Sequence, residues 1–186
     1  MKAEYFYNSL LYYSSESSVC EQSMAEDITR QGEILIVLVE DDPHHRKKMK
    51  DILTDSFPNC VIKTIANGVE ACNYLLNPVN HYNLVILDGR LDTYPTTLLA
   101  KVNGPDVAEA MRERNIDVPI VLWTNDPKML QSFDEVCGMR LPEIEKPCRS
   151  YNVEAVLTPI ITKITQGIHA KQEEENDKDE QFSLKL

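Results

Sequence analysis

Residues 34–39, with the sequence ILIVLV, are the feature that most constrains the fold of this chain. A strand with one solvated face alternates apolar and polar residues, whereas a strand that is apolar throughout is typical of a parallel sheet covered on both faces. Similar short runs follow at 60–65, 84–87 and 119–123, and a weaker one lies at 141–144. These patterns predict five strands.

Segments with the periodicity of amphipathic helices lie between most of these runs. Helices are expected after Pro43, which suits a first helical turn, after Asn67-Gly68, from Gly104, and from about Tyr151 into the 160s. Pro159 predicts a kink or a break in the last helix. Only a short, apolar-poor connection is expected between the fourth and fifth strands. Strands that alternate with helices indicate a doubly wound α/β fold with right-handed crossovers.

The two ends of the chain differ from this central pattern. Residues 1–32 combine aromatic residues with a serine-rich stretch at 14–18 and are predicted to be a partly flexible N-terminal extension. Residues 169–186 include the charge run KQEEENDKDEQ, which has no apolar face, so an acidic and disordered tail is predicted. The folded domain is therefore expected to span residues 33–168.

Composition excludes several classes of protein. The 186 residues carry 19 basic and 30 acidic side chains, and a net charge of −11 disfavours binding to nucleic acid or to anionic membranes. The basic cluster at 46–50 is interpreted as a solvated helix face. Five widely spaced cysteines without a CxxC pair indicate neither a zinc site nor a disulfide framework. With no long apolar run and no signal-peptide pattern, a cytoplasmic location is expected.

Polar residues follow the predicted strands at the points where ligands bind in such sheets. Glu40, Asp41 and Asp42 follow the first run, Asp88 the third and Thr124 the fourth, and Lys146 lies in the fifth region. Converging carboxylates repel one another unless a cation joins them, and oxygen ligands favour Mg²⁺. Each residue also has a simpler interpretation, as a helix cap or a turn residue.

Five motifs in this order give the chain a family resemblance. VLVEDDP, IANGVEA, LVILDGRL, VLWTND and EKP, over roughly residues 33–165, resemble the receiver domain of two-component response regulators, which is CheY-like. The resemblance implies a flavodoxin-like (βα)5 fold, a five-stranded parallel sheet of order 2-1-3-4-5. It implies that Glu40 and Asp41 form the family's acidic pair and that Asp88 is the phosphoacceptor. Thr124 and Lys146 match its hydroxyl and lysine positions, and Arg90 matches the residue whose backbone carbonyl binds the metal.

A phosphorylation mechanism follows from the resemblance. Asp88 would accept a phosphoryl group from a sensor histidine kinase or a phosphotransfer protein. Mg²⁺ would be held by Asp41, Asp88 and the Arg90 carbonyl, with Glu40 acting through water, while Lys146 and Thr124 would contact phosphoryl oxygens. A single-domain regulator would signal to a downstream protein by contact or pass the group on in a phosphorelay. It would catalyse only its own phosphotransfer and autodephosphorylation, and the apolar last helix could serve a homodimer.

Three departures from the family pattern bear on this mechanism. Asp92 replaces the usual proline four residues after the phosphoacceptor, and the segment DTYPTTLLAKVNG lengthens the loop that ends at Gly104. Asn125 is bulkier than the small residue that usually follows the switch hydroxyl. Glu143 stands where many receivers carry the aromatic residue that rotates on activation.

Other functions remain as alternatives. A receiver-like scaffold that binds partners without being phosphorylated would explain the three departures. A phosphatase with an aspartyl nucleophile is disfavoured because Arg90 occupies the place of its usual second acid, and a dinucleotide site is disfavoured because no GxGxxG follows the first strand. His44 and His45 are interpreted as solvent-facing or capping residues rather than metal ligands, and Trp123 as a core residue.

Overall fold

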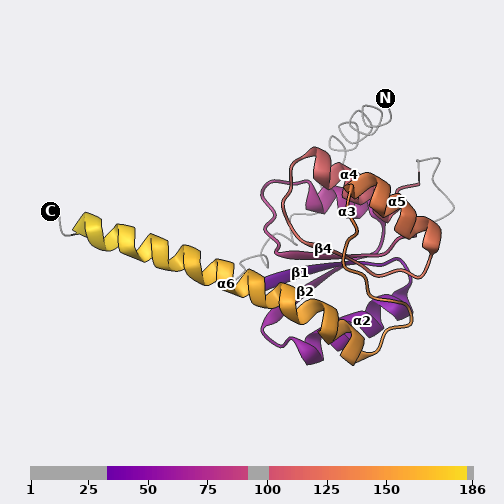
Figure 1. The fold of residues 1–186 in the computed structure, drawn as a ribbon, viewed down its shortest axis with the longest axis horizontal. Coiled ribbons are helices and arrows are strands. Elements are labelled where there is room, and N and C mark those ends of the chain that lie inside the picture. Colours follow the sequence, from indigo (N-terminus) through magenta and orange to yellow (C-terminus); the bar gives the residue numbers. More distant parts are fainter. Residues whose placement is uncertain (1–32, 92–100, 184–186) are drawn as a thin grey trace, which may run out of the picture. The chain divides into compact units, whose positions relative to one another are not determined.

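A computed structural model describes residues 33–91 and 101–183, with side chains as far as residue 170. The predicted extension at 1–32 and the loop segment 92–100 lie outside the described residues. Four parallel strands form one sheet in the order β2-β1-β3-β4 (Figure 1). They are β1 (Ile34–Val39), β2 (Cys60–Ile65), β3 (Leu84–Leu87) and β4 (Ile120–Leu122).

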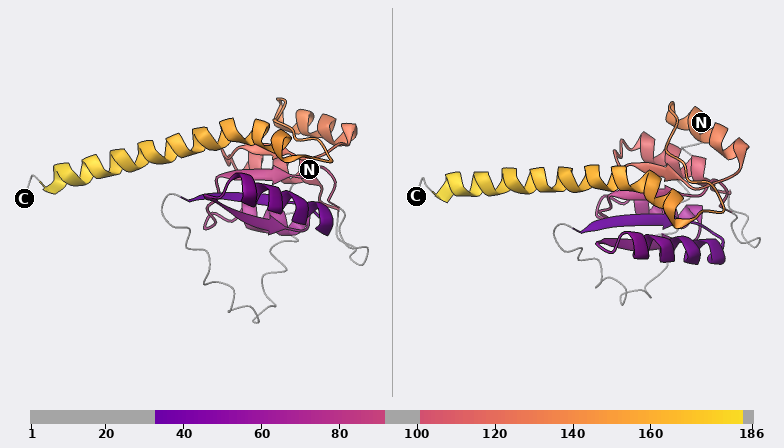
Figure 2. Two further views of the ribbon diagram at one scale, coloured as in Figure 1. Left: turned by 90° about the horizontal axis from the view of Figure 1, so that it is seen from below. Right: turned by 60° about the horizontal axis from the view of Figure 1, so that its bottom comes forward.

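Helices cover both faces of the sheet, which confirms the predicted α/β class (Figures 1 and 2). One face packs against α3 (Gly68–Leu75), α4 (Gly104–Glu113) and α5 (Pro127–Cys137). The other packs against α2 (Pro43–Ser56) and the first turns of α6 (Ser150–Ser183). Every residue of β1 is buried because alternate side chains enter the two cores.

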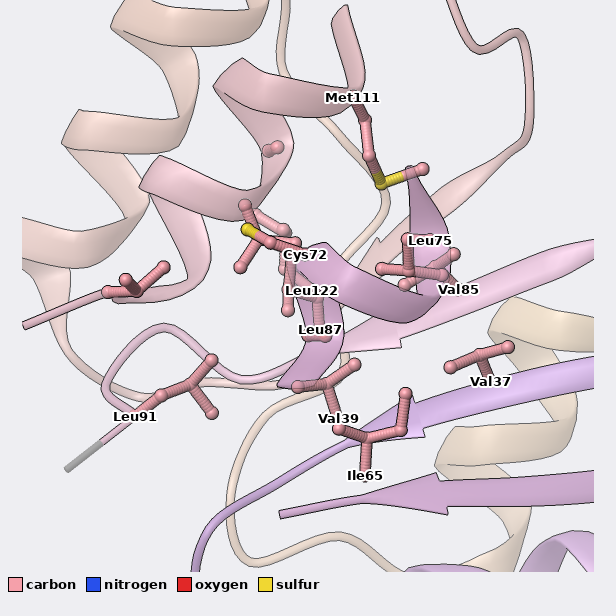
Figure 3. Close-up of a cluster of buried hydrophobic side chains, with 14 of the residues drawn as sticks. Val37, Val39, Ile65, Cys72, Leu75, Val85, Leu87, Leu91, Met111 and Leu122 are labelled. Carbon is pink, nitrogen blue, oxygen red and sulfur yellow. The ribbon is translucent and has the colours of Figure 1, made fainter. Parts of the chain in front are cut away.

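Figure 3 shows the core between the sheet and helices α3 and α4, which contains Val37 and Val39 of β1, Val85 and Leu87 of β3 and Leu122 of β4. The register places Val37 opposite Val85 and Val39 opposite Leu87. Because these strands are parallel and in register, their carboxyl ends meet at one edge of the sheet. That edge carries Glu40, Asp88 and Thr124.

Helix α5 was not anticipated in the connection after the fourth strand. Asp126 caps it by accepting a hydrogen bond from the Lys128 amide at 2.9 Å, and Pro127 occupies its first turn. It ends at Gly138, whose φ of 66° is a left-handed conformation that glycine adopts readily. The start and stop signals were therefore present in the sequence, but only Phe133 is fully buried and the apolar pattern is weak.

The predicted fifth strand at 141–144 is reduced to a single bridge between Leu122 and Glu143. The Leu122 amide donates to the Pro142 carbonyl and the Ile144 amide donates to the Leu122 carbonyl, both at 2.8 Å. Pro142 has no amide hydrogen to extend this pairing. The segment nevertheless lies beside β4, the place that the order 2-1-3-4-5 gives to a fifth strand.

Helix α6 runs without a break through Pro159 and continues to Ser183, past the expected start of a disordered tail at residue 169. Pro159 is exposed, while apolar residues from Val153 to Ile168 pack on the core along the same helix. The Lys, Gln and Glu residues that follow are good helix formers, which accounts for a helix where the charge run suggested disorder. Among the described residues, no helix is both long and apolar enough to cross a membrane.

Candidate functional site

Three carboxylates converge at the carboxyl edge of the sheet. Glu40 follows β1 and Asp88 follows β3, and their amides continue the ladder by donating to Ile65 and Val39 carbonyls at 3.0 Å. One carboxylate oxygen each from Glu40, Asp41 and Asp88 lies within 4.8 Å of the other two. Glu40 and Asp88 are buried and Asp41 is half-buried. The arrangement predicted from the strand ends is therefore present in space.

Lys146 provides the positive charge within this group. Its Nζ lies 2.6 Å from Glu40 Oε2 and 3.0 Å from Asp88 Oδ1, and its side chain is only 11% exposed. The Lys146–Pro147 peptide bond is cis. Buried carboxylates need such a partner, because removing an ionised group from water without compensation is costly.

The two buried acids of the cluster have raised pKa values, because Lys146 offsets the effect of burial only in part. Burial, followed by repulsion from Asp88, raises the pKa of Glu40 to about 7, and Lys146 opposes this rise. Burial also raises the pKa of Asp88, again opposed by Lys146. The site therefore favours additional positive charge.

Backbone groups fix the orientation of these acids. The Gly89 amide donates to Asp88 Oδ1 at 2.7 Å, and the Asp42 amide donates to Glu40 Oε1 at 3.1 Å. Arg46 Nη1 donates to the backbone carbonyls of Glu40 at 2.6 Å and Asp41 at 3.0 Å. The sequence placed Arg46 in a solvated cluster, and no local pattern distinguishes it from the lysines beside it.

Thr124 lies at the same edge, directly after β4 and the buried Trp123. Its side chain is buried, and its Oγ1 accepts a hydrogen bond from the Asp126 amide at 3.3 Å. A Cβ added to Gly89 would come within 2.9 Å of this hydroxyl oxygen. Thr124 therefore packs against the residue that follows Asp88.

Arg90 joins the loop after β3 to the start of α5. Its Nη2 lies 2.6 Å from Asp126 Oδ2, and this ion pair lowers the pKa of Asp126. The Arg90 side chain is largely exposed, so the pair lies at the rim of the site. The metal-binding role of the Arg90 carbonyl remains a prediction, because the described contacts concern its side chain.

The lengthened loop has its two ends clamped beside the site. The Leu91 amide donates to Asn103 Oδ1 at 3.3 Å, and the Gly104 amide donates to the Gly89 carbonyl at 3.0 Å. The additional residues of the loop lie within 92–100, outside the described part of the chain. The clamp holds Gly89, and through it Asp88, at the strand end despite the greater loop length.

The other two departures, Asn125 and Glu143, differ in their surroundings. Asn125 is exposed, directly after Thr124. Glu143 forms an ion pair with Arg140 at 3.0 Å and takes part in the bridge to β4. Glu143 is therefore used in a structural contact at the position where the family resemblance places an aromatic switch.

The donor set fits a hard divalent cation. Carboxylate oxygens are the ligands that Mg²⁺ prefers, and burial raises the pKa values of two of these acids, Glu40 and Asp88, an effect that Lys146 opposes. Asp41 and Asp88 would hold the ion directly, with Glu40 beside them. A parallel α/β sheet with this acid cluster and a paired lysine at its carboxyl edge defines the class, a doubly wound α/β domain with its polar site at the ends of the strands.

Comparison with known proteins gives the family. The model of the response regulator receiver domain matches residues 36–149, and the chain belongs to this family. No curated protein sequence matches the chain.

Solved structures agree with the fold. The signal receiver domain of an HD domain-containing protein from Pseudomonas fluorescens Pf-5 matches with a TM-score of 0.58 and 15% identity, over 72% of this chain and 98% of that one. The signal receiver domain of a putative LuxO repressor protein from Vibrio parahaemolyticus matches with a TM-score of 0.57 and 16% identity, over 73% of this chain and 95% of that one. The BeF3-activated DrrB receiver domain matches with a TM-score of 0.53 and 20% identity, over 70% of this chain and 98% of that one.

Proposed function

We propose that Asp88 accepts a phosphoryl group from the phosphohistidine of a sensor histidine kinase or a phosphotransfer protein. The chain then signals as a single-domain response regulator through contact with a downstream protein. The observation that carries this proposal is the position of Lys146 Nζ, 3.0 Å from Asp88 Oδ1, within a cluster of three carboxylates. A phosphoryl group on Asp88 would bring further negative charge next to an ammonium that is already in place.

Asp88 is the nucleophile in this mechanism. One of its carboxylate oxygens forms a bond to phosphorus while the bond between phosphorus and the donor imidazole nitrogen breaks, and the electron pair remains on that nitrogen. The carboxylate must be ionised to attack. Lys146 favours the ionised form by lowering the pKa of Asp88 against the effect of burial.

Lys146 and Thr124 would bind oxygens of the transferred phosphoryl group. The ammonium, which neutralises Asp88 before transfer, is positioned to pair with a phosphoryl oxygen afterwards. Because Thr124 Oγ1 accepts its hydrogen bond from the Asp126 amide, its own hydroxyl proton can be donated to another oxygen. A shift of Thr124 would then change the loop that leads to α5, and this change is the signal.

Mg²⁺ is the cofactor that these residues would bind. Asp41, Asp88 and the Arg90 carbonyl would hold it, with Glu40 acting through water. The ion would supply positive charge to the oxygens of the transferring phosphoryl group. This role accords with the raised pKa values of Glu40 and Asp88.

Incubation with acetyl phosphate and Mg²⁺, followed by intact mass spectrometry, tests the proposal. The wild type should gain the mass of one phosphoryl group, lost again on treatment with hydroxylamine, and Asp88→Asn should gain none. Asp51→Asn is the matched control, because Asp51 lies exposed on α2 and pairs only with Lys47 among the described ion pairs. An unlabelled wild type would exclude Asp88 as an acceptor from small donors.

A second candidate is a scaffold that binds a partner without phosphorylation. The structural use of Glu143, which pairs with Arg140, favours it because the usual aromatic readout is replaced. Equal affinity of the wild type and Asp88→Asn for a captured partner, with and without acetyl phosphate, would support the scaffold over the switch.

A further inference from the structure

Trp123 presents the face of its indole ring to the lysine of the site. Lys146 Nζ lies 4.5 Å from the ring centroid. The indole is 1% exposed, and the lysine side chain above it is also largely buried. Trp123 is the last residue before Thr124, so the same short segment carries both the hydroxyl of the site and the ring beneath its ammonium.

The surroundings of the Lys146 ammonium leave it little freedom. An ammonium has three hydrogen-bond donors. Glu40 Oε2 accepts one hydrogen bond at 2.6 Å, Asp88 Oδ1 forms an ion pair with the ammonium at 3.0 Å, and the ring face covers a further direction. Attraction between a cation and an aromatic face is stronger when both are removed from water, as they are here.

Packing alone does not explain an indole at this position. The core around Trp123 is otherwise built mainly from aliphatic residues of β1, β3, α2 and α6. The indole N–H lies toward the Cys148 thiol, a weak acceptor, and makes no hydrogen bond of normal length to a described residue. Buried tryptophans usually satisfy this donor, so the ring face is the part of the side chain that is used.

A second contact fixes the ring from helix α2. The imidazole of His45 packs edge-on against the indole, with centroids 6.1 Å apart and an interplanar angle of 65°. His45 belongs to the first turn of α2, which Asp42 caps through the His44 and His45 amides. The indole is thereby held in contact with α2 and Lys146 at once.

We propose that Trp123 is a positioning residue that holds the Lys146 ammonium against Asp88 for phosphoryl transfer. The kinetic part of this inference rests on the proposed function. The contact itself does not, because it is present in the unphosphorylated protein. Loss of the aromatic face should leave the carboxylates in place but allow the ammonium to occupy several positions, which slows the transfer without abolishing it.

Two variants in the full-length chain separate the ring face from simple core filling. Trp123→Phe keeps an aromatic face and Trp123→Leu removes it, while both make the side chain smaller. Leu157→Ala creates a cavity in the same core from α6 and serves as the matched control for loosened packing. Urea unfolding of each variant establishes that labelling is measured on folded protein.

The contact is measured first, by NMR of the Lys146 side chain. Ring current should shift the ε-methylene protons upfield in the wild type, in Trp123→Phe to a smaller extent, and not in Trp123→Leu. Ordinary lysine shifts in the wild type would overturn the inference, whatever the labelling results.

The rate of labelling by acetyl phosphate with Mg²⁺ is measured second. Trp123→Leu should reduce the maximal rate about fivefold, the size expected for a cation–π contact of moderate strength. Trp123→Phe should remain within about twofold of the wild type, as should Leu157→Ala. An unchanged rate in Trp123→Leu, or an equal loss in Leu157→Ala, would overturn the positioning role. An unlabelled wild type with a normal ring-current shift would instead count against the proposed function.

Discussion

Gly104, the first residue of α4, lies directly against the backbone carbonyl of Asp88. A Cβ at this position would overlap the carbonyl oxygen and would come within 2.7 Å of the Phe133 ring. The Gly104 amide also donates to the Gly89 carbonyl at 3.0 Å. The start of α4 therefore sets the position of the backbone at Asp88.

Gly104→Ala should destabilise the protein and impair labelling of Asp88. The methyl group has no space against backbone atoms, so the α4 start or the Asp88 backbone must move, at a cost of about 1–3 kcal/mol. Urea unfolding gives the stability and acetyl phosphate labelling gives the effect on the site. Gly167→Ala is the control, since nothing lies within 4 Å of its added Cβ and helix propensity should stabilise it by roughly 0.5–1 kcal/mol. Wild-type stability and labelling in Gly104→Ala would show that this contact is not tight.

Lys146→Met should destabilise the Mg²⁺-free protein more at pH 8 than at pH 6. Without the ammonium, the pKa values of Glu40 and Asp88 rise further above those of the unfolded chain. Folding then takes up protons, so stability falls as pH rises from about 4 toward the folded pKa values. Breaking a buried pair costs about 3–5 kcal/mol when the remaining charge stays ionised.

Urea unfolding at the two pH values, with and without Mg²⁺, measures this effect, and Mg²⁺ should restore part of the loss at pH 8. Lys47→Met is the comparison, because Lys47 is exposed and its pair with Asp51 lies at the surface. A loss in Lys146→Met that is the same at both pH values would refute the electrostatic explanation.

Mg²⁺ affinity should weaken as pH falls below about 7. Burial raises the pKa of Glu40 to about 7, so below this pH a proton occupies the acid cluster and competes with the cation. The apparent dissociation constant should then rise by up to about tenfold for each pH unit. Trp123 fluorescence during Mg²⁺ titrations at pH 6, 7 and 8 gives the constants, because its ring contacts Lys146. Glu40→Gln should make the Mg²⁺ dissociation constant less dependent on pH. Identical Mg²⁺ dissociation constants in the wild type at pH 6 and pH 8 would contradict this prediction.

Asp126 has two separable roles, as partner of Arg90 and as cap of α5. Asp126→Asn removes the ion pair but keeps an oxygen for the Lys128 amide, so it should destabilise less than Asp126→Ala, which removes both. Arg90→Gln should resemble Asp126→Asn, since the ion pair lies at an exposed rim. Thermal unfolding at low and high salt ranks the variants, and added salt should reduce the stability difference between the wild type and the two variants that lack only the ion pair, Asp126→Asn and Arg90→Gln. If Asp126→Asn were less stable than Asp126→Ala, the role of Asp126 as the cap of α5 would be excluded.

The sequence determined the strands and the edge at which the polar residues meet. Residues 34–39, 60–65 and 84–87 form β1, β2 and β3 with the predicted bounds, because each is a continuous run of apolar or β-forming residues between clear breaks. Given a parallel sheet, the positions of Glu40, Asp88 and Thr124 follow from strand direction alone. Local pattern was a poorer guide for α5 and the fifth strand, where few buried residues mark the elements.

Only the tertiary structure decided which side chains touch. The pairing of Lys146 with Glu40 joins residues 106 positions apart, and the contacts of Trp123 with Lys146 and of Gly104 with Asp88 depend on how four separate segments pack. Periodicity assigns a residue to a face or an edge, but distances of 3 to 5 Å between distant segments are set by the packing of the whole domain. The local sequence therefore determines which residue types lie at this edge of the sheet. The packing of the whole domain determines which of their charged groups pair with one another.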